Sequence, residues 1–504
     1  MSSLTVPLRR ALRTDLTASL VVFLVALPLC VGVAVASGVP AELGLVTGIV
    51  GGLITGLLPG SSLQVSGPAA GLTVLVYEAV NAYGLPALGI IVLAAGLVQL
   101  ALGAMKLGRW FRAISVAVVE GMLAGIGLVI IAGQLYAMAG AKAPASGLGK
   151  IAGLPGLAAE LVSSAAALSA FVIGAGSIVV MVLWARMPAR VRMVPGALVA
   201  VGVSTAVAAL CGMRVAKVQV RGLLGAIQPP GPAEVGQLVE IGVLGTVVAF
   251  TLIASAESLF SAAAVDRLHD GPRTDYDKEL MAQGAGNTLC GVLGALPMTA
   301  VIVRSAANVQ AGAKTKASRV LHGVWLLLFA ALLPAVLGVI PVAALAGVLV
   351  YAGFKLLPLT QLGPLWREHR GEAVILMVTA LAIVAVNMFE GVLIGLGLAI
   401  VKTAWETSHI QVEVLDHGHG PVRATLTGNA TFLRLPKMLD TLEALPIDRP
   451  IELDLLGLRH LDHACLTALT AWAERHDTEG TEPVRLMAID RSPRHRHGLG
   501  SGHN

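Results

Sequence analysis

Long apolar runs alternate with short polar connections over residues 1–405. A helix of about 20 apolar residues crosses the hydrocarbon core of a bilayer, and many of the runs approach this length. The pattern therefore predicts fourteen membrane-spanning helices in two groups of seven. The first group comprises Leu16–Ser37, Leu43–Pro59, Leu63–Val80, Leu85–Met105, Ala113–Met138, Ser163–Ala185 and Val194–Gly212. The second group comprises Leu238–Ala264, Lys278–Leu296, Thr299–Gly312, Val320–Ile340, Val342–Leu357, Ala373–Met388 and Gly391–Ala404.

The composition supports a polytopic membrane protein. Of the 504 residues, 56% are hydrophobic and 13% are charged, and the mean hydropathy is +0.81. A soluble domain carries about 25% charged residues, so this chain has too few charges to cover a water-facing surface of its size. A soluble enzyme, a disordered protein and a nucleic-acid binder are therefore disfavoured.

The basic residues of the predicted connections favour one orientation. Eighteen Lys and Arg residues fall in connections on one side of the membrane, and five fall on the other side. The five are Lys142, Lys150, Arg214, Lys217 and Arg221. Because cytoplasmic loops carry an excess of Lys and Arg, both termini are predicted to be cytoplasmic.

The composition changes near Trp405, after which the pattern is that of a soluble protein rich in Arg, His and Asp. We expect a transmembrane domain over residues 1–405 and a small cytoplasmic α/β domain over residues 409–490. The remaining residues, 491–504, are predicted to form a disordered tail.

An internal repeat emerges when Pro59 is aligned with Pro297, an offset of 238 positions. Gly48, Gly52 and Gly56 then fall on Gly286, Cys290 and Gly294. The repeats cover about residues 16–212 and 238–404, and each holds seven predicted spans. An odd number of spans forces the two copies into opposite orientations. The predicted fold is an all-α membrane protein of seven-plus-seven inverted repeats, in which helices 3 and 10 are broken.

Polar and helix-breaking residues interrupt the third and tenth predicted helices. Ser66-Gly67-Pro68 is typical of a helix start, with Ser66 as the cap and Pro68 in the first turn. The repeat alignment places Arg304 opposite Ser66, so two half-helices are expected to direct their N-termini toward each other. Their backbone N–H groups and dipoles would bind an anion. The candidate anion-binding residues are Ser66, Gly67, Pro68, Ala69, Val303, Arg304, Ser305 and Ala306.

Arg304 and Glu257 are the charged residues that the pattern places deep in predicted spans. A carboxyl group at this depth is usually protonated, paired or bound to a cation. The hydroxyl groups of Ser258 and Ser261 follow Glu257 closely, so the three residues could carry a proton or hold Na⁺. An ion pair between Glu257 and Arg304, with a structural role alone, is the alternative.

These features resemble the SulP family of inorganic anion transporters, known in animals as solute carrier family 26. The resemblance covers nearly the whole chain. The segments that carry it are Ala26–Gly32, Gln64–Val74, Glu279–Asn287 and Val303–Thr315. It implies core and gate domains, a homodimer, and an anion site between the third and tenth helices. It also implies that the carboxyl group of Glu257 serves coupling to H⁺ or Na⁺.

The segment Pro28-Leu29-Cys30-Val31-Gly32, together with Ile302–Ser305, is similar to a bacterial branch of that family associated with carbonic anhydrases. This resemblance implies bicarbonate as the substrate, a bacterial inner-membrane location and a functional link to carbonic anhydrase. Leu29 departs from the family pattern, because many relatives have Gln there. A side-chain amide contact to the substrate is therefore not expected at this position.

The soluble region resembles a STAS domain. Residues Ile451–Leu458 predict a buried strand and loop, and Ala464–His476 predict a helix. The segment His460–Ala464 occupies the place of the family's phosphorylatable loop, but no Ser follows Asp462. A phosphorylation switch at this loop is therefore not expected.

The combined interpretation is a secondary active transporter of bicarbonate in a lipid bilayer, coupled to Na⁺ or H⁺. The alternative within the family is a symporter or exchanger of sulfate or a dicarboxylate. A nucleobase-type transporter, a passive anion channel and a STAS-linked sensor are the other classes, which the pattern favours less. No nucleophile–base pair or nucleotide loop suggests an enzyme, and the four Cys residues are too widely spaced for a metal site. No cofactor and no nucleic-acid partner are expected.

Overall fold

The computed structural model describes residues 8–109, 115–144, 146–188, 191, 194–220, 222–479 and 484–487. The predicted tail at 491–504, the start of the predicted span at Ala113 and the basic residue Arg221 lie outside these residues. The chain forms two compact units, Met1–Leu396 and Gly397–Asn504, which divide within a helix, a few residues before the boundary near Trp405 that the composition suggested.

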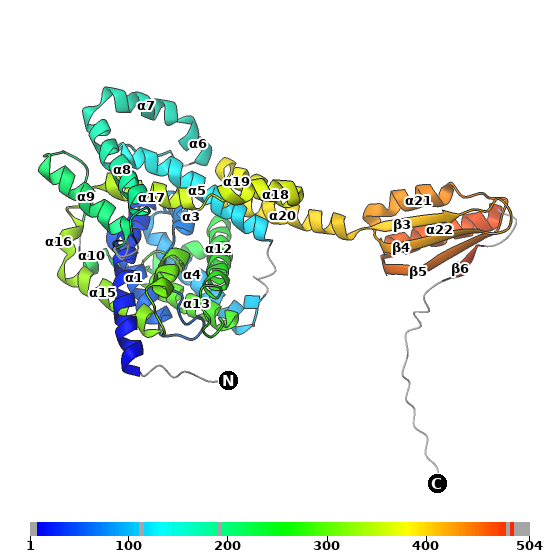
Figure 1. Ribbon diagram of the computed structural model, residues 1–504, viewed down its shortest axis with the longest axis horizontal. Helices are drawn as coiled ribbons and strands as arrows, with labels where there is room; N and C mark the ends of the chain where they lie inside the picture. Colours follow the sequence, from blue (N-terminus) through cyan, green and yellow to red (C-terminus); the bar gives the residue numbers. More distant parts are fainter. Residues whose placement is uncertain are drawn as a thin grey trace, which may run out of the picture. The chain divides into compact units, whose positions relative to one another are not determined.

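The first unit is almost entirely helical (Figure 1). Its first half contains α1 (Leu8–Ala36), α2 (Ala41–Val50), η1 (Gly51–Thr55), β1 (Ser66–Pro68), η2 (Ala70–Leu72), α3 (Thr73–Tyr83), α4 (Leu85–Ala104), α5 (Val116–Met138), α6 (Gly147–Ala152), α7 (Leu154–Ser163), α8 (Ala165–Trp184) and α9 (Gly196–Leu210). Its second half contains α10 (Leu223–Ala226), α11 (Pro232–Gly236), η5 (Gln237–Val239), α12 (Ile241–Val265), α13 (Tyr276–Val292), β2 (Met298–Ala300), α14 (Ile302–Gln310), α15 (Ala317–Leu332), α16 (Pro334–Leu337), α17 (Val342–Lys355), α18 (Leu359–Glu368), α19 (Arg370–Ala385) and α20 (Met388–Thr407).

Each of the fourteen predicted spans overlaps one of these helices. Within the described residues, seven helical stretches are long and apolar enough to cross a membrane: Leu12–Ala36, Leu85–Ala104, Val116–Met138, Ala165–Trp184, Ile241–Val265, Val342–Glu368 and Met388–Thr407. Several of the others are shorter, including those of the third and tenth predicted spans, which follow extended segments.

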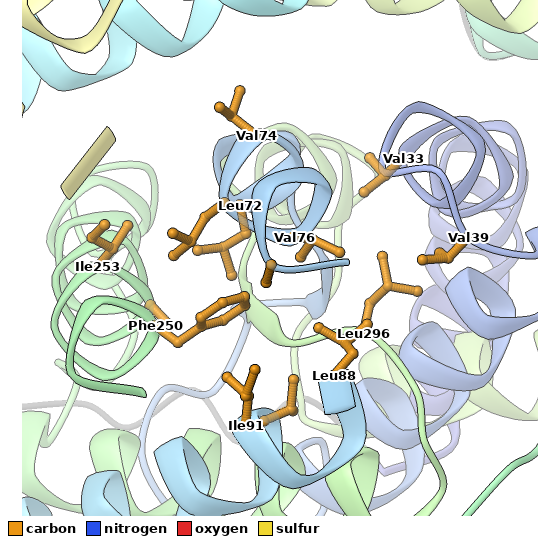
Figure 2. Packing of buried hydrophobic residues seen from close by; sticks show 14 of the residues in the cluster. Val33, Val39, Leu72, Val74, Val76, Leu88, Ile91, Phe250, Ile253 and Leu296 are labelled. Carbon is orange, nitrogen blue, oxygen red and sulfur yellow. The ribbon is translucent and has the colours of Figure 1, made fainter. Parts of the chain in front are cut away.

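Small residues let the helices approach closely. A Cβ added to Gly96 of α4 would lie 2.3 Å from the backbone N of Thr288 on α13, and one added to Gly291 would lie 2.2 Å from the backbone N of Leu93. Helix α3 lies in a core built from α1, α4 and α12, where Leu72 and Val76 pack near Phe250 and Leu88 (Figure 2). This core fixes the position of the helix that follows the first broken segment.

The second unit is a small α/β fold. Its sheet has the order β3 (Ile410–Leu415), β4 (Val422–Ala430), β5 (Ile451–Leu461) and β6 (Arg485–Met487). The pair β3–β4 is antiparallel, and the pairs β4–β5 and β5–β6 are parallel. The other elements are η6 (Phe432–Arg434), α21 (Leu435–Glu443) and α22 (His463–Glu479). The predicted strand and helix are confirmed, but His460 and Leu461 belong to β5, so the expected loop shrinks to Asp462.

Candidate functional site

The two broken segments meet as a short antiparallel pair of strands. Ser66, Gly67 and Pro68 of β1 stand opposite Ala300, Thr299 and Met298 of β2. The backbone N–H of Val301 also donates to the carbonyl of Val65, at 2.9 Å. Helical structure begins immediately after each strand, at Ala70 and at Ile302. The predicted meeting of two helix starts is therefore present, and a strand pair sets its geometry.

The structure corrects the details of that prediction. Ser66 and Pro68 lie in a strand, and the first helical turn begins at Ala70, so Ser66 does not cap a helix. The two strands begin 232 positions apart, at Ser66 and Met298, instead of the aligned 238. The two prolines on which the alignment rests therefore stand at different distances from the strands, because Pro59 precedes β1 by seven residues and Pro297 precedes β2 by one. Arg304 consequently lies within the first turn of α14 and does not pair with Ser66.

Arg304 is completely buried beneath β1. One terminal nitrogen, Nη2, donates to the carbonyl oxygen of Pro68 at 3.3 Å. A Cβ added to Gly67 would lie 2.1 Å from Nη1, so a larger residue here would displace the guanidinium. Nε and Nη1 have no hydrogen-bond partner among the described residues. A permanent positive charge with unused donors therefore lies behind the strand pair.

Among the other candidate anion-site residues, the two serines make hydrogen bonds within the fold, whereas two residues of α14 are more exposed. The hydroxyl of Ser305 accepts from the backbone N–H of Val65 at 2.9 Å and donates to the carbonyl of Val301 at 2.8 Å. The hydroxyl of Ser66 accepts from Nε2 of Gln283 at 2.7 Å. These two hydroxyls hold the fold together, whereas Val303 is 62% exposed and Ala306 is half-buried.

Glu257 lies on α12 and faces the start of the third helix. A Cβ added to Gly71 would lie 2.6 Å from its Oε1, and the carboxyl group also interacts with the hydroxyl of Thr299. Its Oε2 has no hydrogen-bond partner among the described residues. Because Nη1 of Arg304 is likewise unpartnered, an ion pair between the two residues does not account for their burial.

The two serines expected beside Glu257 differ in their contacts. The hydroxyl of Ser258 accepts from the backbone N–H of Ala300 at 3.3 Å, which ties α12 to β2. Ser261 is 2% exposed, so it lies in the interior as expected. The structure thus brings Glu257 and Ser258 to the strand pair. In the described residues no group of three His, Cys, Asp or Glu side chains could hold a metal ion, so a Na⁺ ion here would depend on one carboxyl group and on hydroxyl or backbone oxygens.

Sequence reasoning missed a buried polar cluster next to β1, centred on Glu279. Its Oε2 accepts from the backbone N–H of Ser61 at 2.7 Å. Its Oε1 accepts from Nε2 of Gln283 at 2.8 Å and from Nε2 of Gln64 at 3.2 Å. Glu279 is 1% exposed, so Glu257 is not the one deeply buried carboxylate of the predicted spans. The signal in the sequence was the spacing of four between polar residues of α13, which aligns them on one helix face.

The next polar residue on this face, Asn287, fixes β2. Its Oδ1 accepts from the backbone N–H of Met298 at 2.7 Å, and its Nδ2 donates to Oε1 of Gln99 at 2.8 Å. Nε2 of Gln99 in turn donates to the hydroxyl of Ser255 on α12 at 3.1 Å. Side chains from α4, α12 and α13 therefore hold the strand pair in one arrangement.

The structure also corrects the expected position of Arg319, which the sequence pattern placed in a cytoplasmic connection between helices. It is 2% exposed in α15 and donates to the carbonyl of Leu58 at 3.0 Å and to that of Gln64 at 3.4 Å. Lys316, just before the helix, donates to the same carbonyl of Leu58 at 3.0 Å. These two cations hold the segment that leads into β1.

Known proteins resemble this chain in sequence and in fold. The model of the sulfate permease family matches residues 12–379. YvdB from Bacillus subtilis, whose name refers to sulfate transport, is 29% identical over 348 residues, which are 68% of this chain and 64% of that protein. The bicarbonate transporter BicA from Synechocystis is 28% identical over 335 residues, which are 64% of this chain and 56% of that protein. The alignments thus span about three fifths of the length of these curated relatives.

Solved structures extend the likeness to the fold. The transmembrane domain of a cyanobacterial BicA has a TM-score of 0.65 and 25% identity, and the match covers 78% of this chain and 98% of that domain. SLC26A9 has a TM-score of 0.78 at 17% identity, with 95% of this chain and 84% of that chain covered, which shows the fold alone. The matched family consists of transporters and not of enzymes, as the sequence predicted. This multi-pass membrane protein, with its strand pair and buried arginine, belongs to the sulfate permease family.

Proposed function

We propose that the protein is a secondary active transporter of a small inorganic anion, with bicarbonate as its substrate. The observation that carries the proposal is the unused donor capacity of Arg304, completely buried behind a strand pair from which two helices start. Helix N-termini and a fixed guanidinium favour negative charge, and an Arg without a carboxylate partner leaves that charge uncompensated. An anion at the strand pair would accept hydrogen bonds from the helix N-termini and compensate the charge of the guanidinium.

Bicarbonate is favoured by the resemblance of the Pro28–Gly32 segment and by the likeness to BicA. Sulfate is the second candidate, because the family model and YvdB carry that name. Both are small oxyanions that accept hydrogen bonds from backbone N–H groups, so the strand pair suits either. Substrate identity is therefore a question for transport measurements.

Coupling is proposed to run through Glu257. Its carboxyl group adjoins Gly71 at the start of the third helix, and one of its oxygens has no hydrogen-bond partner in the part of the chain that the structure describes. A proton or Na⁺ bound there would neutralise the carboxylate next to the anion site, so that cation and anion favour one another's binding. A dicarboxylate symporter or an exchanger would use the same arrangement with another substrate.

The same interpretation extends to the topology, the oligomeric state and the location of the protein. We propose fourteen spans as inverted repeats, both termini in the cytoplasm, a homodimer in a bacterial inner membrane, and a functional link to carbonic anhydrase. The chemistry of the anion site depends on none of these features. A passive channel or a STAS-linked sensor would differ from this proposal in having no gradient-driven accumulation.

Uptake of labelled bicarbonate, sulfate and a dicarboxylate into proteoliposomes tests the function. We expect bicarbonate to accumulate above its equilibrium level when a Na⁺ or pH gradient is imposed. Arg304→Gln is the matched control, because it keeps a polar side chain and removes the charge; it should abolish accumulation. Equilibration without accumulation would favour a channel, and no flux of any anion would contradict transport.

A further inference from the structure

A cavity with a mainly apolar wall and a few polar side chains lies outside the strand pair, since no residue of β1 or β2 lines it. Its volume is about 260 Å³, and it is bordered by the end of α1 and by α3, α5 and α6. None of the eight candidate anion-site residues lines it. The polar side chains in its wall are Thr73, Tyr77, Gln134, Lys142 and Lys150.

Thr73 lines this cavity. It is the first residue of α3 and is 5% exposed, and its hydroxyl has no hydrogen-bond partner among the described residues. A buried polar group without a partner is costly, so this hydroxyl calls for water or a ligand.

Lys150 supplies a cation to the same cavity. It is 5% exposed, and its Nζ lies 5.2 Å from the ring centre of Tyr77. The hydroxyl of Tyr136 donates to its carbonyl oxygen at 2.8 Å, which fixes α6 against α5. The other charged groups that act here are Glu78, which attracts Lys150, Glu390, which repels Glu78, and Lys142, which is exposed at the rim.

We propose that this cavity is a second anion-binding site, in which Lys150 and the hydroxyl of Thr73 hold a small inorganic anion on its way to the central site. The inference rests on the proposed transport function. Water occupies about 30 Å³ per molecule, so the volume admits an oxyanion with part of its hydration shell. On arrival the anion competes with the carboxylate of Glu78, which also attracts Lys150.

Because the anion and Glu78 compete for Lys150, substitutions of Lys150 and of Glu78 should change the KM for uptake in opposite directions. Lys150→Met removes the cation, so the KM for uptake should rise by about tenfold, as expected for the loss of a charged hydrogen bond. Glu78→Gln removes the competing carboxylate, so the KM should fall. The maximal rate should change little in either variant, because the strand pair is untouched. Lys150→Arg should keep a KM near that of the wild type.

The measurement is the concentration dependence of labelled bicarbonate and sulfate uptake into proteoliposomes. Lys217→Met is the matched control, since this exposed Lys belongs to the same predicted outside face and does not line the cavity. In parallel, the melting temperature of the purified protein is followed as a function of each anion. Lys150→Met should need about tenfold more anion for the same stabilisation.

Several results would overturn the site. One is an unchanged KM and an unchanged anion titration in Lys150→Met. Another is a change of the KM in the same direction in Lys150→Met and in Glu78→Gln. That result would show that the two side chains form only a structural contact between α3 and α6. A wild-type melting temperature independent of both anions would also overturn it. If the anion titration shifts as expected but no variant and no wild type transports, the site stands and the proposed transport function falls.

Discussion

Gly71 and the carboxyl group of Glu257 are in direct contact. A Cβ at position 71 would lie 2.6 Å from Oε1 and 2.7 Å from Oε2, so no other residue fits here without moving the carboxyl group. Gly71 belongs to the first half of the helical unit and Glu257 to the second. The start of the third helix is thereby joined to the carboxyl group that we propose for coupling.

Glu257→Gln is the first prediction. The amide keeps the size of the side chain and removes the group that binds H⁺ or Na⁺. We expect gradient-driven accumulation to disappear, while exchange of labelled for unlabelled anion continues. Both are measured in the same proteoliposomes under the same Na⁺ and pH gradients. Full accumulation by the variant would show that Glu257 has no part in coupling.

Gly67→Ala is expected to weaken anion binding. The added Cβ would lie 2.1 Å from Nη1 of Arg304 and must displace the guanidinium within a packed interior. Such overpacking costs about 1–3 kcal/mol of folding stability. Because the displaced guanidinium no longer holds its place behind the strand pair, we also expect weaker anion binding. Titration of the melting temperature with the anion measures the effect.

Gly245→Ala in α12 serves as its control, because no described atom outside its own stretch of helix lies within 4 Å of the added Cβ. If Gly67→Ala binds the anion as tightly as the wild type does, the position of the Arg304 guanidinium has no role in anion binding. Substitution of Ser305 is a less specific test of the anion site. Its hydroxyl joins Val65 to Val301, so its loss disturbs the strand pair itself.

Glu279→Gln is expected to destabilise the helical unit. The carboxylate accepts from the backbone N–H of Ser61 and from the amides of Gln64 and Gln283, and hydrogen bonds to a charged group contribute about 1.5–3 kcal/mol each. We expect a lower melting temperature of the purified protein. Glu160→Gln, at an exposed position of α7, is the control and should leave it unchanged.

The native cysteines test the topology. Within the described residues Cys211 is exposed at the end of α9, whereas Cys30, Cys290 and Cys465 are buried. The predicted orientation places Cys211 outside. A membrane-impermeant maleimide applied to intact cells should therefore label the wild type and not Cys211→Ser. Labelling that requires permeabilised cells would reverse the orientation.

Asp462 gives the soluble unit a defined pH dependence. Backbone N–H groups of Cys465, at 2.8 Å, and of Phe432, at 2.6 Å, donate to its carboxylate and hold its pKa below the ordinary value. Stability from a lowered pKa is present above the unfolded-state pKa and is lost as the pH falls through the folded-state pKa. We expect α22 to lose protection against hydrogen exchange below about pH 4 and to be insensitive between pH 6 and 8.

Asp462→Asn should remove this pH dependence, because the amide does not titrate. It should also weaken the start of α22 by up to about 1 kcal/mol at neutral pH, since Asn still caps a helix. Hydrogen exchange of the first turn of α22, corrected for the intrinsic rate, measures both effects. An unaltered pH profile in the variant would assign the transition to another carboxylate.

The sequence by itself determined the membrane class, the helices and the two interrupted segments. Apolar runs specify helices because, in a bilayer, backbone groups must be satisfied within the segment. Glycine and proline at positions 67 and 68 prevent a continuous helix, so the break was also predictable. The strand and helix of the soluble unit followed in the same way from local patterns at 451–458 and 464–476.

Only the tertiary structure decided how those segments meet. The register of Ser66 with Ala300, the burial of Arg319 and the cluster around Glu279 join residues more than 200 positions apart. Repeat alignment could not supply them, because small residues are common wherever membrane helices pack closely, and the aligned offset of 238 differs by six from the offset between the two strands. Hydrogen bonds between distant segments depend on the packed arrangement of α12, α13 and α15, and local sequence does not encode that arrangement.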